Sequence, residues 1–306
     1  MTEKQFTKKA FQKTSHILRR HESKALIIVP VHRPPTLLPH ALNSILKQKE
    51  QDFRVHIICD GAPEETNQAA LAWSQKDRRF SAHIMGKGPR NGEAYRDPII
   101  RDVRADFVCQ LADDDLWFPN HLVEMEQMLN RADFGHSLQV NVHPDLTMRF
   151  DVQTIAMEKT RERMVLEKYN IFGPTVAAYR RSAYLKLKEG WTTTPQDLYT
   201  DLHMWRKFIA DKTIRFSACN DFTSLHFPAA QSHHVDIETR ERLMMKAVDI
   251  INTPVTLAKL KARLHVALER TDKHLPRRSK NFEDNAAYIM CNLSELLPEL
   301  DLTIDE

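Results

Sequence analysis

The first half of the chain alternates short apolar runs with stretches of amphipathic spacing. Residues 25–29, 55–59 and 107–112 are largely apolar runs, a pattern typical of buried parallel strands. The first two are separated by apolar side chains at helical spacing, namely Leu37, Leu38, Ala41, Leu42, Ile45 and Leu46. Further elements are predicted as helices over 64–75, over 93–103 and after Pro119, and as a strand over 81–85. This alternation predicts an α/β fold on a mostly parallel, doubly wound, Rossmann-like sheet.

The alternation weakens after about residue 130. Residues 134–142 and 146–150 have the pattern of strands, whereas 158–169 and 179–188 have that of helices. From residue 235 to 267 the spacing of apolar positions is helical, and no strand signal follows. The last part of the chain is therefore predicted to be a helical extension packed on the main domain.

Composition narrows the class of protein. With 306 residues, 42% of them hydrophobic, the chain can bury a substantial core. No apolar stretch approaches the roughly 18 residues of a membrane-spanning helix, and the basic segment 1–24 has no hydrophobic signal core. These features favour a cytoplasmic protein, with a peripheral contact to the membrane left open. The four cysteines form no CxxC pair and are interpreted as reduced.

The net charge of +3 does not require a polyanionic partner. The sequence has neither a zinc-ligand pattern nor basic residues interleaved with aromatic ones, so nucleic acid is not an expected partner. Charge is nevertheless uneven, because residues 259–280 are basic whereas 281–306 carry acids without Lys or Arg. A solvated helix face explains such a run as well as a docking surface does.

Three consecutive acids, Asp113, Asp114 and Asp115, follow the apolar run 107–112. The carboxyl ends of strands are where open α/β sheets bind ligands. Adjacent carboxylates repel one another, and a hard divalent cation such as Mg²⁺ or Mn²⁺ would neutralise them. The alternative is a solvated acidic turn that precedes the helix predicted after Pro119. The helix dipole favours acidic side chains at that position. The local sequence leaves both interpretations open.

Three segments in order carry a resemblance to a known family. They are Ile27-Ile28-Val29-Pro30-Val31-His32-Arg33-Pro34-Pro35, Ile57-Ile58-Cys59-Asp60-Gly61-Ala62 and Leu111-Ala112-Asp113-Asp114-Asp115-Leu116-Trp117-Phe118-Pro119. Together they resemble the family 2 glycosyltransferases of the GT-A fold, over about residues 25–230. The sequence departs from that family where Arg33 replaces a usual Asn, and where Cys59-Asp60 replaces a usual pair of acids.

The resemblance implies a division of the chain and a donor site. Residues 1–24 would be a basic segment, 25–234 the GT-A domain and 235–306 the helical extension. Within the domain, residues 25–130 would bind the nucleotide and 131–234 the acceptor. Donor-binding residues would be Pro30, His32, Asp60, Arg96, Asp113 and Asp114.

Roles within this site follow from the same resemblance. Asp60 would accept hydrogen bonds from the base or ribose, although a turn-forming Asp before Gly61 is an equally good local explanation. Arg96 would hold the base edge or the acids. Asp113 and Asp115 would hold Mn²⁺ or Mg²⁺, and alternation along an extended segment would place them on one side.

The acceptor side is implied by segments further along the chain. Asp201, which precedes an aromatic helical stretch, matches the base that deprotonates the acceptor hydroxyl, and Asp197 is the reserve candidate. A helix N-terminal acid is the structural alternative for Asp201. His226 would complete the metal site, although a lone histidine after a strand is more often a core residue. His233 and His234 would otherwise lie on a loop that closes over the donor.

These inferences predict a metal-dependent, inverting glycosyltransferase. It would move a sugar from a nucleotide-diphospho-sugar, with UDP-sugar the first choice, to a hydroxyl of a glycan, lipid-linked or other acceptor. A nucleotidyltransferase of the same fold is the enzymatic alternative, but residues 29–36 contain no glycine for a phosphate loop. The non-enzymatic alternative is a scaffold that docks through the basic residues 1–24 and 259–280.

Overall fold

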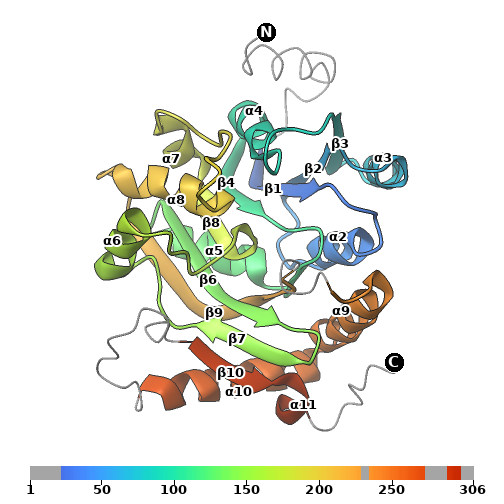
Figure 1. Cartoon of the computed structure of the whole chain (residues 1–306), viewed down its shortest axis with the longest axis vertical. Coiled ribbons are helices and arrows are strands. Elements are labelled where there is room, and N and C mark those ends of the chain that lie inside the picture. Colours follow the sequence, from blue (N-terminus) through green and yellow to red (C-terminus); the bar gives the residue numbers. More distant parts are fainter. Residues whose placement is uncertain (1–21, 229–233, 273–287, 298–306) are drawn as a thin grey trace.

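The computed structural model describes residues 22–228, 234–272 and 288–297. The sheet that these residues form has ten strands, with the order β10-β7-β6-β8-β4-β1-β2-β3 and with β5 and β9 off this path (Figure 1). Four parallel strands make the first half, and β1 lies between β2 and β4. They are β1 (Ser23–Val31), β2 (Phe53–Asp60), β3 (Phe80–Met85) and β4 (Ala105–Gln110).

Helices cover both faces of this parallel half, as the alternation predicted. Successive residues of β1 point to opposite faces, so Leu26 and Ile28 join one buried cluster while Ile27 and Val29 join another. All four side chains are fully buried, which explains why the strand is a continuous apolar run rather than an alternating one. The helices are α2 (Leu38–Leu46), α3 (Glu64–Lys76), α4 (Arg96–Asp102) and α5 (His121–Leu129), with a 3₁₀ turn, η1 (Glu93–Tyr95), before α4.

The second half of the sheet is mixed. Strands β6 (Phe134–Val142) and β7 (Thr147–Asp151) lie where the sequence predicted them. Strand β8 (Ala177–Arg180) pairs antiparallel with β4 and β6, and so joins the two halves. Strand β9 (Phe216–His226) is parallel to β6, and the two-residue β5 (Leu116–Trp117) pairs antiparallel with β9.

One helix predicted in this half is wrong in part. Residues 179–188 begin as the end of β8, and the helix α7 is confined to Arg181–Lys186. Tyr179 is fully buried between neighbouring aromatic rings, so sheet packing overrides its local helical pattern. The remaining elements are α6 (Glu158–Leu166), the 3₁₀ turn η2 (Pro174–Val176) and α8 (Thr200–Ala210).

The C-terminal part contains the predicted helices and one strand that was not predicted. Helices α9 (Ile237–Asn252) and α10 (Pro254–Asp272) are followed by β10 (Tyr288–Asn292) and by the short α11 (Leu293–Leu296). Strand β10 pairs antiparallel with the edge strand β7, so the expectation of no strand after residue 235 is wrong. A five-residue strand gives little periodic signal, and its partner lies more than a hundred positions earlier. In Figure 1, β10, α10 and α11 lie below β7 at the bottom of the molecule.

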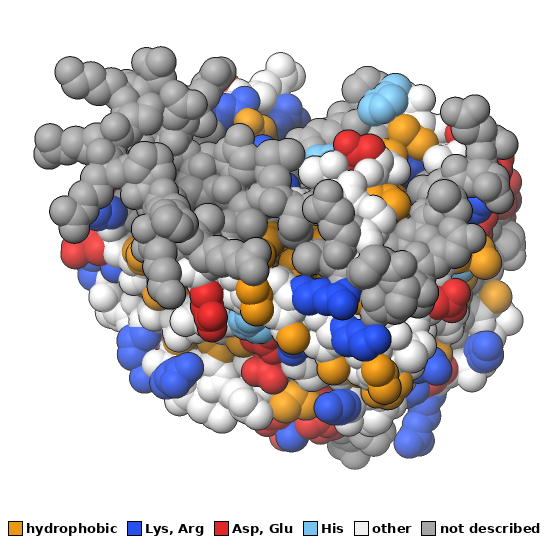
Figure 2. Space-filling model, turned by 90° about the horizontal axis from the view of Figure 1, so that it is seen from below, with side chains coloured by type: hydrophobic (Ala, Val, Ile, Leu, Met, Phe, Trp, Pro, Cys, Tyr) orange, Lys and Arg blue, Asp and Glu red, His pale blue; other side chains and the backbone are white. Residues whose placement is uncertain are grey.

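Two surface observations bear on partners. Among the described residues, no helix combines the length and apolar character needed to cross a membrane. On the described part of the face in Figure 2, Lys and Arg side chains lie interspersed with acidic and hydrophobic ones rather than in one patch. Most of the N-terminal segment, residues 1–21, lies outside the described residues, as do 273–287 and 298–306. The docking surface of the scaffold alternative therefore stays a hypothesis.

Candidate active site

The carboxyl ends of β1, β2 and β4 bring together the side chains predicted to bind the donor. Asp60 ends β2 and is buried. Its carboxylate accepts a hydrogen bond from the Gly88 amide at 2.6 Å and pairs with the Lys87 ammonium. Gly92 has φ +60°, and a Cβ there would collide with the Asp60 carboxylate. The loop from residue 86 to 92 thus needs glycine in order to fold over Asp60.

Pro30 and His32 lie at the end of β1, on either side of its last residue, Val31. His32 is exposed. Partial desolvation, together with the charge of Arg33, lowers the pKa of His32. A neutral imidazole at this edge can donate or accept a hydrogen bond.

The three consecutive acids are all buried, with exposed fractions of 3%, 3% and 0% for Asp113, Asp114 and Asp115. Strand β4 ends at Gln110, and Asp113 and Asp114 form a turn. The predicted alternation is therefore wrong, because it requires an extended backbone. Instead, Asp113 and Asp114 share one set of partners and Asp115 has another.

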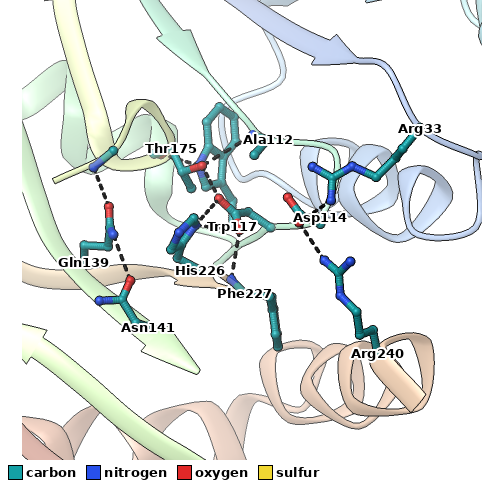
Figure 3. A network of polar contacts seen from close by, with 12 residues as sticks. Arg33, Ala112, Asp114, Trp117, Gln139, Asn141, Thr175, His226, Phe227 and Arg240 are labelled. Atoms are coloured by element: carbon teal, nitrogen blue, oxygen red, sulfur yellow. Dashed lines mark hydrogen bonds and ion pairs between the residues drawn. The ribbon is translucent and has the colours of Figure 1, made fainter. Parts of the chain in front are cut away.

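Two arginines from distant parts of the chain neutralise the first two acids. Arg33 lies with its Nη1 2.8 Å from Asp114 Oδ2 and its Nε 3.1 Å from Asp113 Oδ2. Arg240, on α9, places its Nη2 2.9 Å from the same Asp114 oxygen. Figure 3 shows Arg33 and Arg240 approaching Asp114 from different elements. Burial raises the pKa of Asp113 to about 7 against the lowering effect of Arg33, and burial with the charge of Asp115 raises that of Asp114.

Asp115 is held by fixed groups instead. Its carboxylate accepts hydrogen bonds from the Thr175 hydroxyl and, at 3.0 Å, from the Phe227 amide. His226 Nδ1 lies 2.8 Å from both of its oxygens. Burial disfavours the imidazolium, yet the Asp115 carboxylate outweighs it and raises the pKa of His226. The register of β5 on β9 pairs Leu116 with Leu225, which sets Asp115 opposite His226.

Arg96 lies elsewhere in the site. Its Nη1 donates to Gln110 Oε1 at 3.0 Å, and its guanidinium lies 4.4 Å from the centre of the Trp191 ring. Gln110 is the last residue of β4. Arg96 therefore supports the strand that carries the acids, and its hydrogen bond goes to that strand rather than to the acids.

The candidate base lies in the first turn of α8. Asp201 accepts hydrogen bonds from Asn170 Nδ2 at 2.8 Å and from the Leu202 amide at 2.9 Å. Burial nevertheless raises the pKa of Asp201, while these hydrogen bonds lower it. Its charge acts to raise the pKa of both Arg96 and His226, so Asp201 lies within electrostatic range of these two residues. The reserve candidate, Asp197, is exposed.

Comparison with known proteins identifies the family. The model of "Glycosyl transferase family 2" matches residues 26–188, more than half of the 306-residue chain. The chain belongs to glycosyl transferase family 2. This match confirms the family predicted from the three sequence segments, and the strand and helix order described above is that expected for its GT-A fold. The match ends before α8 and α9, so it includes neither Asp201 nor Arg240.

Curated relatives match a smaller part of this family 2 chain. The succinoglycan biosynthesis protein ExoW of Rhizobium meliloti is 31% identical over 114 residues, which are 36% of this chain and 35% of ExoW. An uncharacterized glycosyltransferase of Rickettsia conorii is 27% identical over 109 residues, 35% of this chain and 17% of that protein. The matched part thus spans far less than two thirds of either relative.

Solved structures resemble the family 2 chain along more of its length. The mannosyltransferase PcManGT from Pyrobaculum calidifontis, in complex with GDP-Man and Mn²⁺, has a TM-score of 0.49 and 15% identity, and covers 92% of this chain and 73% of that one. S. aureus TarS 1–349 in complex with UDP has a TM-score of 0.46 and 15% identity, with coverages of 84% and 76%. At these values the likenesses carry no information about the donor or metal of this chain.

The acids at the end of β4 differ in how well they could serve as ligands of a divalent metal. Among residues 22–228, 234–272 and 288–297, no group of three or more His, Cys, Asp or Glu side chains is arranged to hold a metal ion. The carboxylates of Asp113 and Asp115 nevertheless offer hard oxygen ligands. Asp113 Oδ2 is buried and, within the described residues, has an ion-pair contact but no hydrogen bond. As the side chains stand they form no metal site, and Asp113 could bind a metal only if Arg33 moved away from it. His233 lies outside the described residues, whereas His234 is exposed.

Several site residues had no signal in the sequence. Arg240, Thr175 and Asn170 lie 126, 60 and 31 positions from the acids that they contact. No local motif marks them, because only the folded chain brings them to those acids. Arg33 could have been singled out from the sequence, because it occupies a position where the family usually has Asn.

Proposed function

We propose that this family 2 protein transfers a sugar from a nucleotide-diphospho-sugar, preferably a UDP-sugar, to an acceptor hydroxyl with inversion at the anomeric carbon. One observation carries the proposal: within the family-matched range, a buried acidic triplet follows β4 at the same edge of the sheet as the buried Asp60, which ends β2. That sheet edge is where α/β proteins bind nucleotides.

The donor would lie across the ends of β1, β2 and β4. Pro30, His32 and Asp60 would contact the base and ribose, with Asp60 as a hydrogen-bond acceptor. Arg96 would keep β4 in place through Gln110. Asp60 now pairs with the mostly exposed Lys87, and such a partner can give way to a ligand at little cost.

Asp113, Asp115 and His226 would hold Mn²⁺ or Mg²⁺, whose positive charge would offset the charge developing on the nucleoside diphosphate leaving group. Asp113 offers a buried oxygen without a hydrogen bond. Asp115 already accepts hydrogen bonds from three groups, so its share in that role is the smaller. His226 would use Nε2, because its Nδ1 faces Asp115.

Asp201 would act as the base. The acceptor hydroxyl gives its proton to the Asp201 carboxylate while its oxygen forms a bond to the anomeric carbon. The bond from that carbon to the diphosphate oxygen breaks, and the nucleoside diphosphate leaves with the electron pair. The pKa of Asp201 is raised by burial, which brings this carboxylate closer to the neutral range in which a base works best.

We place the reaction in polysaccharide biosynthesis. The support is the 31% identity to part of ExoW, a succinoglycan biosynthesis protein. Conserved fold elements alone do not fix an acceptor, so the acceptor class proposed here is a glycan or a lipid-linked glycan.

A panel of nucleotide sugars tests the function. UDP-, GDP- and other nucleotide sugars should be compared by thermal shift with and without Mn²⁺, because a true donor raises the unfolding temperature. A metal-dependent shift with a UDP-sugar, followed by release of UDP, is expected. If no nucleotide sugar shifts the transition or is turned over, the proposal is wrong.

A further inference from the structure

The two arginines on Asp114 form a cationic site that the family resemblance did not include. Arg33 Nη1 and Arg240 Nη2 lie 2.8 and 2.9 Å from one and the same oxygen, Asp114 Oδ2. Two guanidinium groups repel each other, so they converge on one point only when an anion occupies it. In this structure that anion is a carboxylate of the protein itself. A phosphate oxygen presents the same charge and accepts the same hydrogen bonds.

The helix that carries Arg240 is fixed by packing. Helix α9 buries Leu243, Met244 and Ala247 against the core, so its position is set by packing. The Arg240 side chain is only 13% exposed. With Asp114 it lines a cavity of only about 10 Å³, so a diphosphate can reach these groups only when the Arg240 side chain moves.

The guanidinium of Arg33 also has unused capacity. Its Nε is buried 3.1 Å from Asp113 Oδ2, but neither atom makes a hydrogen bond within the described residues. The two charges attract each other at this distance, but the geometry leaves the hydrogen-bonding capacity of both atoms unused. A ligand that supplied an acceptor to Arg33 and a cation to Asp113 would satisfy both atoms.

Charge balance decides what can enter. Asp113 and Asp114 are offset by Arg33 and Arg240, and Asp115 by His226. A divalent cation alone would add positive charge beside two guanidinium groups. A diphosphate alone would add negative charge beside three carboxylates. Only the two together leave the site balanced.

We propose that Arg33 and Arg240 are diphosphate-binding residues that exchange partners: without a donor they neutralise Asp113 and Asp114, and with a donor they turn to its diphosphate, which frees Asp113 for the metal and Asp114 for the donor. The proposal rests on the donor site of the proposed function. It makes the C-terminal helix α9 part of that site. It also makes metal and diphosphate binding mutually dependent.

Calorimetry with three probes, namely Mn²⁺ alone, UDP and inorganic pyrophosphate, tests the exchange in the full chain. For the native protein, Mn²⁺ alone should bind weakly, and UDP should raise its affinity at least about 10-fold. Arg240→Gln and Arg33→Gln should each weaken UDP and pyrophosphate about 10- to 100-fold, while strengthening Mn²⁺ alone. Arg240→Lys should restore part of the UDP affinity, because it keeps the charge but not the planar fork.

The matched control is Arg242→Gln, an exposed arginine on the same helix whose Nη2 donates to Thr239. It should leave all three affinities unchanged. If Arg240→Gln lowers only the unfolding temperature and leaves UDP, pyrophosphate and Mn²⁺ affinities as in the native protein, Arg240 is a structural pin and the exchange is wrong. If the native protein binds pyrophosphate through these arginines but binds no uridine nucleotide, the exchange is confirmed and the choice of a UDP-sugar as donor is wrong. If it binds neither, both are wrong.

Discussion

Two neighbouring regions of one acidic turn use different partners. Asp113 and Asp114 face arginines whose side chains are long and partly exposed. Asp115, one residue on, faces a threonine hydroxyl, a backbone amide and a histidine on β9. Long cationic side chains can turn to another anion, whereas an amide and a strand residue cannot. Adjacent acids in a sequence thus need not be equivalent: the first two are suited to a ligand and the third to holding the site together.

The largest effect should come from Asp115→Asn. An amide removes the negative charge that offsets His226 and cannot accept every hydrogen bond that the carboxylate accepts, so unfolding should become easier by about 3 kcal/mol. Asp114→Asn should cost less, about 1–2 kcal/mol, because Arg33 keeps its contact with Asp113 and the amide oxygen of Asn can still accept a hydrogen bond from Arg240. Urea unfolding of both variants measures the difference. Equal losses would remove the distinction between the two regions.

Asp201 has the same kind of fixed partners as Asp115, but it has a chemical role in the proposal. Asp201→Asn should lower turnover at least about 100-fold and leave UDP affinity unchanged, because the residue is assigned to the acceptor. Asp197→Asn is the comparison, and it should change turnover far less. A similar loss in both variants would transfer the role of base away from Asp201.

The acidic limb of the pH profile of turnover tests whether Asp201 is the base. Because the pKa of Asp201 is raised, the limb should lie above the usual aspartate range. The Asn170 amide stabilises the carboxylate and lowers its pKa, so Asn170→Ala should move the limb to higher pH. An unmoved limb in that variant would show that another group titrates.

The fully buried histidines and His226 should change the pH dependence of stability in opposite directions. Burial lowers the pKa of His121 to about 3 and that of His136 to about 4. Below the ordinary histidine pKa, these two histidines bind more protons in the unfolded chain than in the native state. The free energy of unfolding therefore decreases as pH falls. Between pH 7.5 and pH 5.5, each of the two histidines should lower the free energy of unfolding by roughly 1 kcal/mol, as measured by urea unfolding at both pH values.

His226 acts in the opposite sense. Its pKa is raised, so its contribution is present below the ordinary histidine pKa and is lost as pH rises through the raised value. His226→Gln should therefore cost more stability at pH 6 than at pH 9. Denaturant unfolding at both pH values checks the sign, and a larger loss at pH 9 would contradict the ion pair with Asp115.

The smallest effect should come from Lys87→Met. Lys87 pairs with the buried Asp60, but its own side chain is 54% exposed. Exposed partners contribute little, so the loss of stability should be below about 1 kcal/mol. Thermal unfolding measures it. A loss as large as that of Asp115→Asn would place Asp60 among the carboxylates with fixed partners.

The sequence by itself determined the parallel half and its ligand edge. Runs such as 25–29 and 55–59 are largely apolar on both faces because helices cover both sides of those strands, and this gives a local pattern that indicates buried parallel strands. Asp60 and the acidic triplet were located by the strands that precede them. The element order and the family were predictable for the same reason.

Tertiary structure decided what those acids face. The turn at Asp113 and Asp114 overrides the alternation expected of a strand, and β9 and α9 bring His226 and Arg240 to the acids from 111 and 126 positions away. Strand β10 likewise depends on its pairing with β7. Local patterns record which face of an element is buried, whereas partners of buried charges are set by packing between distant elements. For that reason the sequence located the acidic turn, but only the fold divided it between Asp113–Asp114 and Asp115.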